Sequence, residues 1–132
     1  MFVDASAIAA ILLNEEDGPS LSERIERAGP GACITSPLAV FEATIAVARN
    51  HKRDVLRARA AVMRFLRGAL IEVAVIDQDT STLSLDAHAQ YGKGTGHPAR
   101  LNFGDCFAYA MAKQHGVSLL YKGDDFSQTD LA

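Results

Sequence analysis

Carboxylates are the side chains whose positions in this sequence suggest chemistry, and Glu42 is the most informative of them. It is the only charged residue in SPLAVFEATIAVA, residues 36–48. Its four neighbours at helical spacing are all apolar: Leu38, Ala39, Ile45 and Ala46. A buried carboxylate is costly unless its pKa rises, a basic side chain pairs with it or a cation binds it. Arg49 is the nearest basic residue on the same predicted helix, so an ion pair and a bound cation are both explanations of Glu42.

Four aspartates lie at the ends of predicted elements. Asp4 follows the first apolar strand, Asp105 lies in the first turn of a helix, and Asp124 and Asp125 follow the last strand. Each has an ordinary explanation as well. Asp4 is a possible helix cap, Asp105 a capping-box acid behind Asn102, and the adjacent aspartates are possible turn residues.

A shared site explains these acids together with Glu42. In an open α/β sheet, ligands collect outside the carboxyl ends of the strands. Carboxylates gathered there repel one another, and a divalent cation relieves the repulsion. Oxygen ligands without His or Cys select Mg²⁺ or Mn²⁺ rather than zinc. Such a centre polarises a phosphodiester, lowers the pKa of a bound water and aligns an in-line attack.

The elements that must position these acids alternate along the chain. Short apolar strands are predicted over residues 1–4, 32–35, 71–76 and 117–121. Helices are predicted over residues 5–13, 21–28, 36–51 and 54–70, from Asp79 or Thr80 to residue 91, and over 102–115. This alternation is typical of an α/β fold in which a parallel sheet is sandwiched by helices. With 132 residues, the chain is expected to form a single domain, residues 1–132.

Composition narrows the class of protein. Hydrophobic content is 48% and charged content 22%, as in ordinary globular proteins, and no apolar run is long enough for a membrane span. The start, MFVDAS, does not resemble a secretory signal, so we expect a cytoplasmic protein with no membrane partner. Cys33 and Cys106 have no zinc-like spacing and are predicted to be reduced core residues.

The charge pattern does not by itself indicate nucleic-acid binding, since the formal net charge is −3. One segment is nevertheless basic, with Asp54 as its single acid: Arg49, His51, Lys52, Arg53, Arg57, Arg59, Arg64 and Arg67. Such a run is either a solvated helix face or a track for phosphates.

Four stretches together resemble the PIN-domain family, and most closely its VapC-type toxins of bacterial toxin–antitoxin pairs. They are VDASAI, SPLAVFEATIAV, NFGDCFAYAMA and LLYKGDDFSQTD. The resemblance covers essentially the whole chain. It implies a PIN-like three-layer α/β/α sandwich with a short-stranded, mainly parallel sheet. It also implies a Mg²⁺- or Mn²⁺-dependent endoribonuclease that cuts single-stranded regions of RNA and leaves 5′-phosphate and 3′-hydroxyl ends.

The resemblance assigns the candidate catalytic and metal-binding residues. Asp4, Glu42 and Asp105 match the family's acidic triad, and Asp125 matches its fourth acid. Related sequences often carry Thr-Asn before that acid, whereas this chain has Tyr-Lys-Gly at residues 121–123, so the adjacent Asp124 is a second candidate, ranked below Asp125. Ser6 matches the small hydroxyl residue near the metal. Asp4 and Asp105 are expected to hold the metal most directly, with Glu42 orienting or deprotonating the attacking water.

Partners are implied in the same way. VapC-type toxins form homodimers, and a VapB-like antitoxin neutralises them by laying its C-terminal segment in an apolar groove. Two apolar faces of this chain line either such a groove or the core: Ile8, Ile11 and Leu12, and Val40, Phe41 and Ile45. Candidates for contact with the RNA backbone are Lys93, His97 and Arg100, together with the basic segment 49–67.

Two other functions remain open from the sequence. A receiver-like phosphoacceptor switch also uses Mg²⁺, with Lys122 after the last strand and Asp77 or Asp79 as the acceptor. It normally needs paired acids after the first strand, where Asp4 stands alone, and it leaves Glu42 unexplained. The other alternative is a PIN-like module that only binds a partner, which the intact set of acids argues against.

Overall fold

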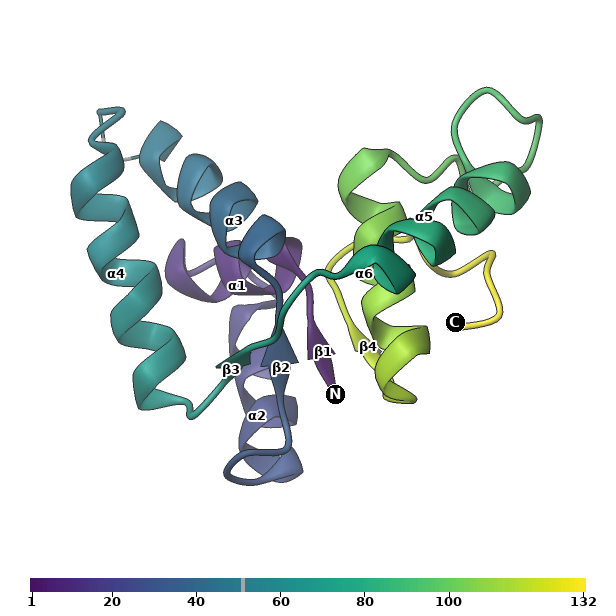
Figure 1. Cartoon of the computed structure of the whole chain (residues 1–132). Helices are drawn as coiled ribbons and strands as arrows, with labels where there is room; N and C mark the ends of the chain where they lie inside the picture. Colours follow the sequence, from purple (N-terminus) through teal and green to yellow (C-terminus); the bar gives the residue numbers. More distant parts are fainter. Residues whose placement is uncertain (51) are drawn as a thin grey trace.

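A four-stranded parallel sheet carries six helices in the computed structural model, which describes residues 1–50 and 52–132 (Figure 1). His51, at the end of a predicted helix, lies outside the described residues. In chain order the elements are β1 (Phe2–Val3), α1 (Ala5–Leu12), α2 (Gly18–Ala28), β2 (Ile34–Thr35), α3 (Pro37–Asn50), α4 (Val55–Gly68), β3 (Glu72–Val73), α5 (Gln78–Tyr91), α6 (Phe103–His115) and β4 (Leu119–Leu120).

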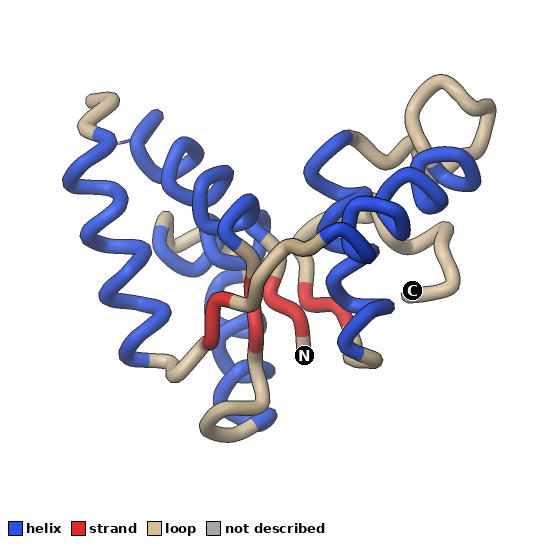
Figure 2. The backbone as a smooth tube through the Cα atoms, in the orientation of Figure 1, coloured by secondary structure: helices blue, strands red, loops and turns tan. Residues whose placement is uncertain are grey.

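The sheet has the strand order β3-β2-β1-β4, and all its pairs are parallel. The strands are short and lie between two groups of helices, α1 to α4 on one side and α5 and α6 on the other (Figure 2). This arrangement confirms the predicted fold class, an α/β/α sandwich with short parallel strands. Val3 pairs with Leu120, and the Asp4 amide donates to the Leu120 carbonyl at 2.9 Å. The chain segments that follow β1 and β4 therefore leave the sheet side by side.

Small and aliphatic side chains hold the layers together. Phe2, Val3 and Leu120 of the central strands are fully buried. Alanines on the facing helices, such as Ala43 of α3 and Ala110 of α6, are fully buried as well. Because alanine adds little bulk, α3 and α6 pack closely against the short strands.

Several element boundaries differ from the predictions. Helix α2, expected from residue 21, begins at Gly18, because Pro19 is accommodated in its first turn. The helix expected to begin at Asp79 or Thr80 is capped by Asp77, because Asp77 and Thr80 form a reciprocal capping box: the Thr80 amide donates to the Asp77 carboxylate at 2.8 Å and the Asp77 amide to Thr80 Oγ1 at 3.2 Å. The strand predicted over residues 71–76 is reduced to β3, since the chain leaves the sheet after it and Val75 is 74% exposed.

Cys33 and Cys106 are buried free thiols, as predicted. Among residues 1–50 and 52–132, no helix is both long enough and apolar enough to cross a membrane.

Candidate active site

Asp4 follows β1 and lies at the carboxyl edge of the sheet, where it also caps α1. The Ser6 amide and hydroxyl both donate to Oδ2 of Asp4, at 3.0 and 2.5 Å. Ser6 Oγ in turn accepts from the Lys122 amide at 3.0 Å, which ties the start of α1 to the segment after β4. Burial raises the pKa of Asp4, the Ser6 hydrogen bonds oppose that rise, and the charge of Asp125 adds to it. The capping role and a place in a shared site are therefore compatible.

Asp105 is likewise both a helix-start residue and a member of the acidic cluster. Its Oδ2 accepts from the Asn102 amide at 2.8 Å, and its own amide donates to the Asn102 side chain at 2.9 Å. Burial raises the pKa of Asp105 to about 6; the Asn102 hydrogen bond lowers it, and the charges of Asp125 and Asp4 raise it. The capping box thus fixes one oxygen of Asp105, while its other oxygen makes no hydrogen bond to the described residues.

Glu42 reaches the same place from α3, and its carboxylate lies against Gly104 of α6. A methyl group added at Gly104 would sit only 2.0 Å from Glu42 Oε1. Burial raises the pKa of Glu42 to about 7, and the charges of Asp4 and Asp105 contribute to the rise. Within residues 1–50 and 52–132 the Glu42 side chain makes no ion pair. Arg49, offered above as a partner, is exposed and not paired with it.

Asp125 and Asp124 are both exposed in the turn after β4, yet they differ in their relation to the other acids. The charge of Asp125 raises the pKa of Asp4 and of Asp105. Asp124 is not among the causes of the raised pKa of Asp105, and its carbonyl accepts from the Ser127 amide at 3.0 Å and hydroxyl at 2.7 Å. This difference favours Asp125 as the fourth member of the cluster, hereafter the acidic cluster: Asp4, Glu42, Asp105 and Asp125.

The donor set of the acidic cluster consists of carboxylate oxygens alone. In the described part of the chain, no three acidic, His or Cys side chains already surround a single ion-sized position. The raised pKa values of Asp4, Glu42 and Asp105 show that the cluster holds negative charge at a cost, with burial as the largest cause and mutual repulsion adding to it. Oxygen donors with uncompensated charge fit a hard divalent cation such as Mg²⁺ or Mn²⁺.

Two of the predicted cationic residues share a cavity with these acids. Lys93 and Arg100 line a cavity of about 410 Å³ together with Asp105, Asp124 and Asp125. A parallel bridge between Gly92 and Leu101 closes the glycine-rich loop, with the Lys93 amide donating to the Leu101 carbonyl at 2.9 Å. Lys93 and Arg100 are the neighbours of the bridged residues Gly92 and Leu101. The bridge therefore holds both basic residues where the two ends of the loop meet, beside the acids.

His97 lies elsewhere in that loop. Its ring packs edge-on against Tyr91, with centroids 4.9 Å apart, and its Nδ1 accepts from the Ala99 amide at 3.2 Å. It lines a separate cavity of about 440 Å³ with Arg100. His97 therefore contributes to the shape of the loop, and it does not line the cavity that contains Asp105 and Asp125.

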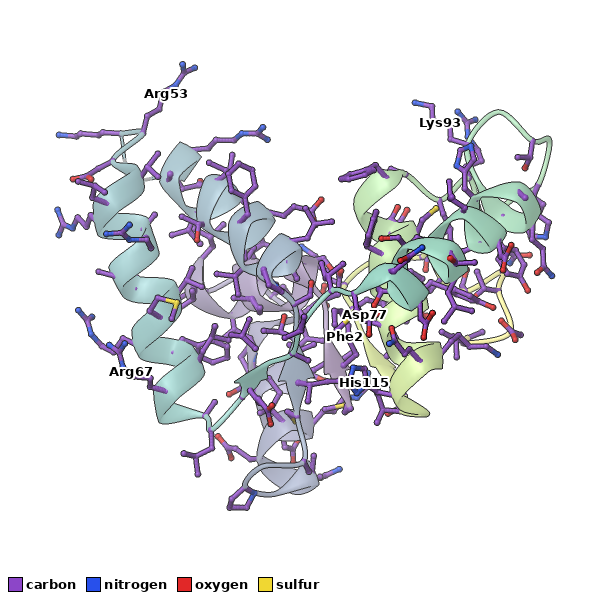
Figure 3. All side chains as sticks on the ribbon, in the orientation of Figure 1. Phe2, Arg53, Arg67, Asp77, Lys93 and His115 are labelled. Carbon is purple, nitrogen blue, oxygen red and sulfur yellow. The ribbon has the colours of Figure 1, made fainter. Side chains whose placement is uncertain are left out.

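The α4 part of the basic segment lies on the solvent-exposed side of that helix. Its described members are all exposed, whereas Ala58, Val62 and Leu66 on the opposite face of α4 are buried. Figure 3 shows Arg53 and Arg67 projecting outward near the two ends of α4, far across the molecule from Lys93. This geometry favours a solvated helix face over a phosphate track leading to the acids.

Lys122 and Asp77, two of the three residues named for a receiver-like switch, are engaged in other contacts. Lys122 forms an ion pair with Glu15 and lies 4.0 Å from Asp17. Asp77 accepts hydrogen bonds from Thr80 and from Gln114 as the cap of α5. A phosphoacceptor site with Lys122 facing Asp77 is therefore not supported by the described residues.

Three features of this region were not predicted from the sequence. Gly104 makes the room that the Glu42 carboxylate occupies, and the only signal for it is its place directly before Asp105. Phe41, placed above on a face that lines either a groove or the core, is 63% exposed, and Phe103 is 69% exposed, so α3 and α6 each carry an exposed aromatic ring near an acid of the cluster. Asp130, which the sequence does not distinguish from a polar tail, bonds to two tyrosines and a lysine.

Comparisons with known proteins agree with this architecture. The sequence profile of the PIN domain matches residues 1–131. A VapC ribonuclease of Rhizobium meliloti (strain 1021) is 47% identical over 141 residues, which cover 98% of each chain. Ribonuclease VapC42 of Mycobacterium tuberculosis (strain ATCC 25618 / H37Rv) is 39% identical over 131 residues, covering 99% of this chain and 96% of that protein. The chain therefore belongs to the PIN-domain family, and its relatives place it among the VapC-type members.

A solved structure supports the fold independently. The crystal structure of VapC20 from Mycobacterium tuberculosis, a toxin that cleaves the sarcin–ricin loop, matches with a TM-score of 0.72. The match covers 96% of this chain and 92% of that one, at 19% sequence identity. At this identity, the likeness concerns the fold alone.

Proposed function

We propose that this chain is a VapC-type endoribonuclease toxin that hydrolyses RNA phosphodiester bonds at the acidic cluster. The observation that carries the proposal is the half-buried Glu42 carboxylate, which lies against α6 and has no ion-pair partner among the described residues. Burial raises its pKa, and the charges of Asp4 and Asp105 add to the rise. A structural carboxylate would be paired or exposed. The VapC ribonucleases named among the relatives support the same activity.

Asp4, Asp105 and Asp125 are the residues that would hold Mg²⁺ or Mn²⁺, with Ser6 supporting Asp4 through its two hydrogen bonds. The bound ion supplies charge stabilisation for the phosphodiester and lowers the pKa of water. Ser6 and Asn102 keep Asp4 and Asp105 in fixed orientations, so little reorganisation is needed on binding. Asp124 stays the second choice to Asp125.

Glu42 is the proposed proton acceptor. A general base works best when its pKa lies near the working pH, and the pKa of Glu42 is about 7 in the protein without a bound cation. Its carboxylate makes no hydrogen bond to the described residues that would compete with an attacking water. Glu42 therefore orients that water and takes its proton as the water oxygen bonds to phosphorus. The bond between phosphorus and the 3′ oxygen breaks, and the 3′ oxygen takes a proton from solvent, which leaves a 5′-phosphate and a 3′-hydroxyl end.

The substrate of this proposal is a single-stranded region of cellular RNA. Lys93 and Arg100, beside Asp105 in the same cavity, supply positive charge for backbone phosphates next to a cluster that would otherwise repel them. His97 shapes the loop that carries both.

Regulation and assembly are part of the same proposal. A VapB-like antitoxin neutralises the toxin, which forms a homodimer and acts in the cytoplasm as one domain over residues 1–132. Exposed apolar side chains such as Phe41, Leu85 and Phe103 offer contact area for protein partners.

The test is cleavage of total RNA by the purified protein with Mg²⁺, with EDTA, and with Mg²⁺ restored. Asp105→Asn is expected to lower the rate by at least about 100-fold while keeping the fold, since asparagine retains an oxygen for the Asn102 amide. Expression of the same variant is expected to permit growth. Full activity of Asp105→Asn in Mg²⁺, or undiminished cleavage in EDTA, would contradict the proposal.

A further inference from the structure

The segment after β4, residues 121–132, carries Asp125 and is attached to the rest of the protein at both ends. At its start, the Lys122 amide donates to Ser6 Oγ at 3.0 Å. Near its end, Asp130 contacts α5 and α6. The Asp125 side chain makes no ion pair within the described residues, so its position depends on the attachments of its backbone.

Asp130 joins three side chains from two helices. Its Oδ1 accepts from the hydroxyl of Tyr109 at 2.7 Å and from that of Tyr91 at 3.4 Å, and its Oδ2 accepts from Lys113 Nζ at 2.8 Å. Tyr91 and Tyr109 are buried, with ring centroids 5.5 Å apart, so their hydroxyls are held in place by packing. One oxygen of Asp130 is thus bound to hydroxyls that core packing holds in place, and the other pairs with an exposed lysine of α6.

The chain between Asp125 and Asp130 transmits this attachment. Phe126 is 1% exposed and packs edge-on against Tyr121, with centroids 4.9 Å apart. The Thr129 amide and hydroxyl both donate to the Phe126 carbonyl, at 3.0 and 2.8 Å. A displacement of Asp130 therefore reaches the residue next to Asp125 through one hydrogen-bonded turn.

Helix α6 carries both the attachment and part of the acidic cluster. Asp105, Tyr109 and Lys113 recur every four residues and so lie along one stripe of the helix, about 6 Å apart. Asp105 lines the same cavity as Asp125, and the charge of Asp125 contributes to its raised pKa. The tail is therefore fastened to the same helix stripe that presents Asp105 to Asp125.

We infer that Asp130 is a positioning residue of the active site, which sets the distance between Asp125 and Asp105 by fastening the tail to Tyr109, Tyr91 and Lys113. This inference rests on the proposed function, because it assigns a purpose to the position of Asp125. Asp130 itself touches neither metal nor substrate.

The experiment measures Mn²⁺ binding to the purified full chain by isothermal titration calorimetry, which does not require cleavage. Asp130→Ala is expected to weaken Mn²⁺ binding about 10-fold, the usual effect of losing a residue that orients a ligand. Asp130→Asn, which keeps an oxygen for Tyr109, is expected to recover part of the affinity. In an Asp125→Asn background, Asp130→Ala is expected to cause no further weakening, because the residue through which it acts is gone.

Asp77→Ala is the matched control. Asp77 is also an exposed aspartate that links α5 to α6, through Thr80 and Gln114, but it has no contact with the tail. It is expected to lower thermal stability without changing Mn²⁺ affinity. If Asp130→Ala does not fold, Tyr109→Phe and Lys113→Met each remove one contact and are expected to give smaller losses of affinity.

Two results would overturn the inference: equal weakening by Asp130→Ala with and without Asp125, or equal weakening by Asp77→Ala. The proposed function is tested separately by RNA cleavage. If the variants show the expected order of Mn²⁺ affinities but the wild-type protein does not cleave RNA, the ribonuclease activity is refuted and the positioning role of Asp130 stands.

Discussion

The substitution Gly104→Ala, at the contact between Glu42 and α6, is expected to lower the rate of RNA cleavage while raising thermal stability. The new Cβ would lie 2.0 Å from Glu42 Oε1, whereas ordinary contact begins at 3.4 Å, so the carboxylate must retreat by about 1.4 Å. Glu42 can do so because the clashing atom is the end of a flexible side chain. A misplacement of about 1 Å at a reacting group costs about 100-fold in rate, so cleavage is expected to fall by that order.

Stability is expected to move the other way. Gly104 lies within α6 and its φ is not positive, so alanine suits the backbone there. Alanine favours a helix over glycine by about 0.5–1 kcal/mol, which raises the melting temperature by a few degrees unless the displaced carboxylate offsets it. Single-turnover cleavage and thermal unfolding of the same preparation measure both quantities.

Gly68→Ala is the control, since Gly68 ends α4 with open space around the new methyl group. It is expected to leave cleavage unchanged. In a Glu42→Gln background, Gly104→Ala is expected to cause little further loss of rate. Wild-type cleavage by a folded Gly104→Ala variant would refute the argument that Glu42 acts from its present position.

The remaining predictions concern protons and substrate. Without divalent metal, the free energy of unfolding is expected to fall as the pH rises from about 4 to about 7, because the folded-state pKa of Asp105 is raised to about 6 and that of Glu42 to about 7. Protonated Asp105 and Glu42 together add roughly 1–2 kcal/mol to the free energy of unfolding, after allowance for their partial exposure. This stabilisation is fully present at a pH below their pKa values in the unfolded chain, and it is lost once the pH exceeds their pKa values in the folded protein. Thermal unfolding in EDTA measures it, and Glu42→Gln must reduce the slope. Metal affinity is expected to rise with pH over the same range, since bound ligands must be deprotonated; titration calorimetry at pH 6 and pH 8 checks this. Lys93→Ala and Arg100→Ala are each expected to raise KM for an RNA substrate, to weaken the salt dependence of KM and to leave kcat little changed. Arg67→Ala, on the far side of α4, is expected to leave both constants unchanged. An equal rise of KM in Arg67→Ala would contradict the assignment of Lys93 and Arg100 to the RNA backbone.

The fold was predictable because its signals are local. Apolar strands, helix caps and breakers recur in sequence order, and the parallel order of the strands follows from the helices between them. The start of α5 was misplaced because a polar contact, the Asp77–Thr80 capping box, competed with apolar spacing. The segment around Glu42, with its single charge, also carries a local signal, because the spacing of its apolar residues alone predicts that this face of the helix is buried.

Other parts of the site could not be read in this way because they depend on contacts between distant segments. Nothing in the sequence says that Gly104 lies under Glu42, 62 positions earlier in the chain, or that Asp130 meets Tyr109. The choice between Asp124 and Asp125 depends on a turn that begins at Gly123 with φ of +93°, a conformation that glycine permits but whose direction no pattern specifies.

The acids of the cluster divide into two kinds by what holds them. Asp4 and Asp105 are helix-start residues whose carboxylates are fixed within three residues of sequence, by Ser6 and Asn102. Glu42 and Asp125 make no ion pairs within the described residues and owe their places to Gly104 and to the attached tail. Ligands of a hard cation gain from fixed geometry, which the local caps supply to Asp4 and Asp105 and the attached tail supplies to Asp125. Glu42 suits the proton instead, because its pKa of about 7 lies near the working pH.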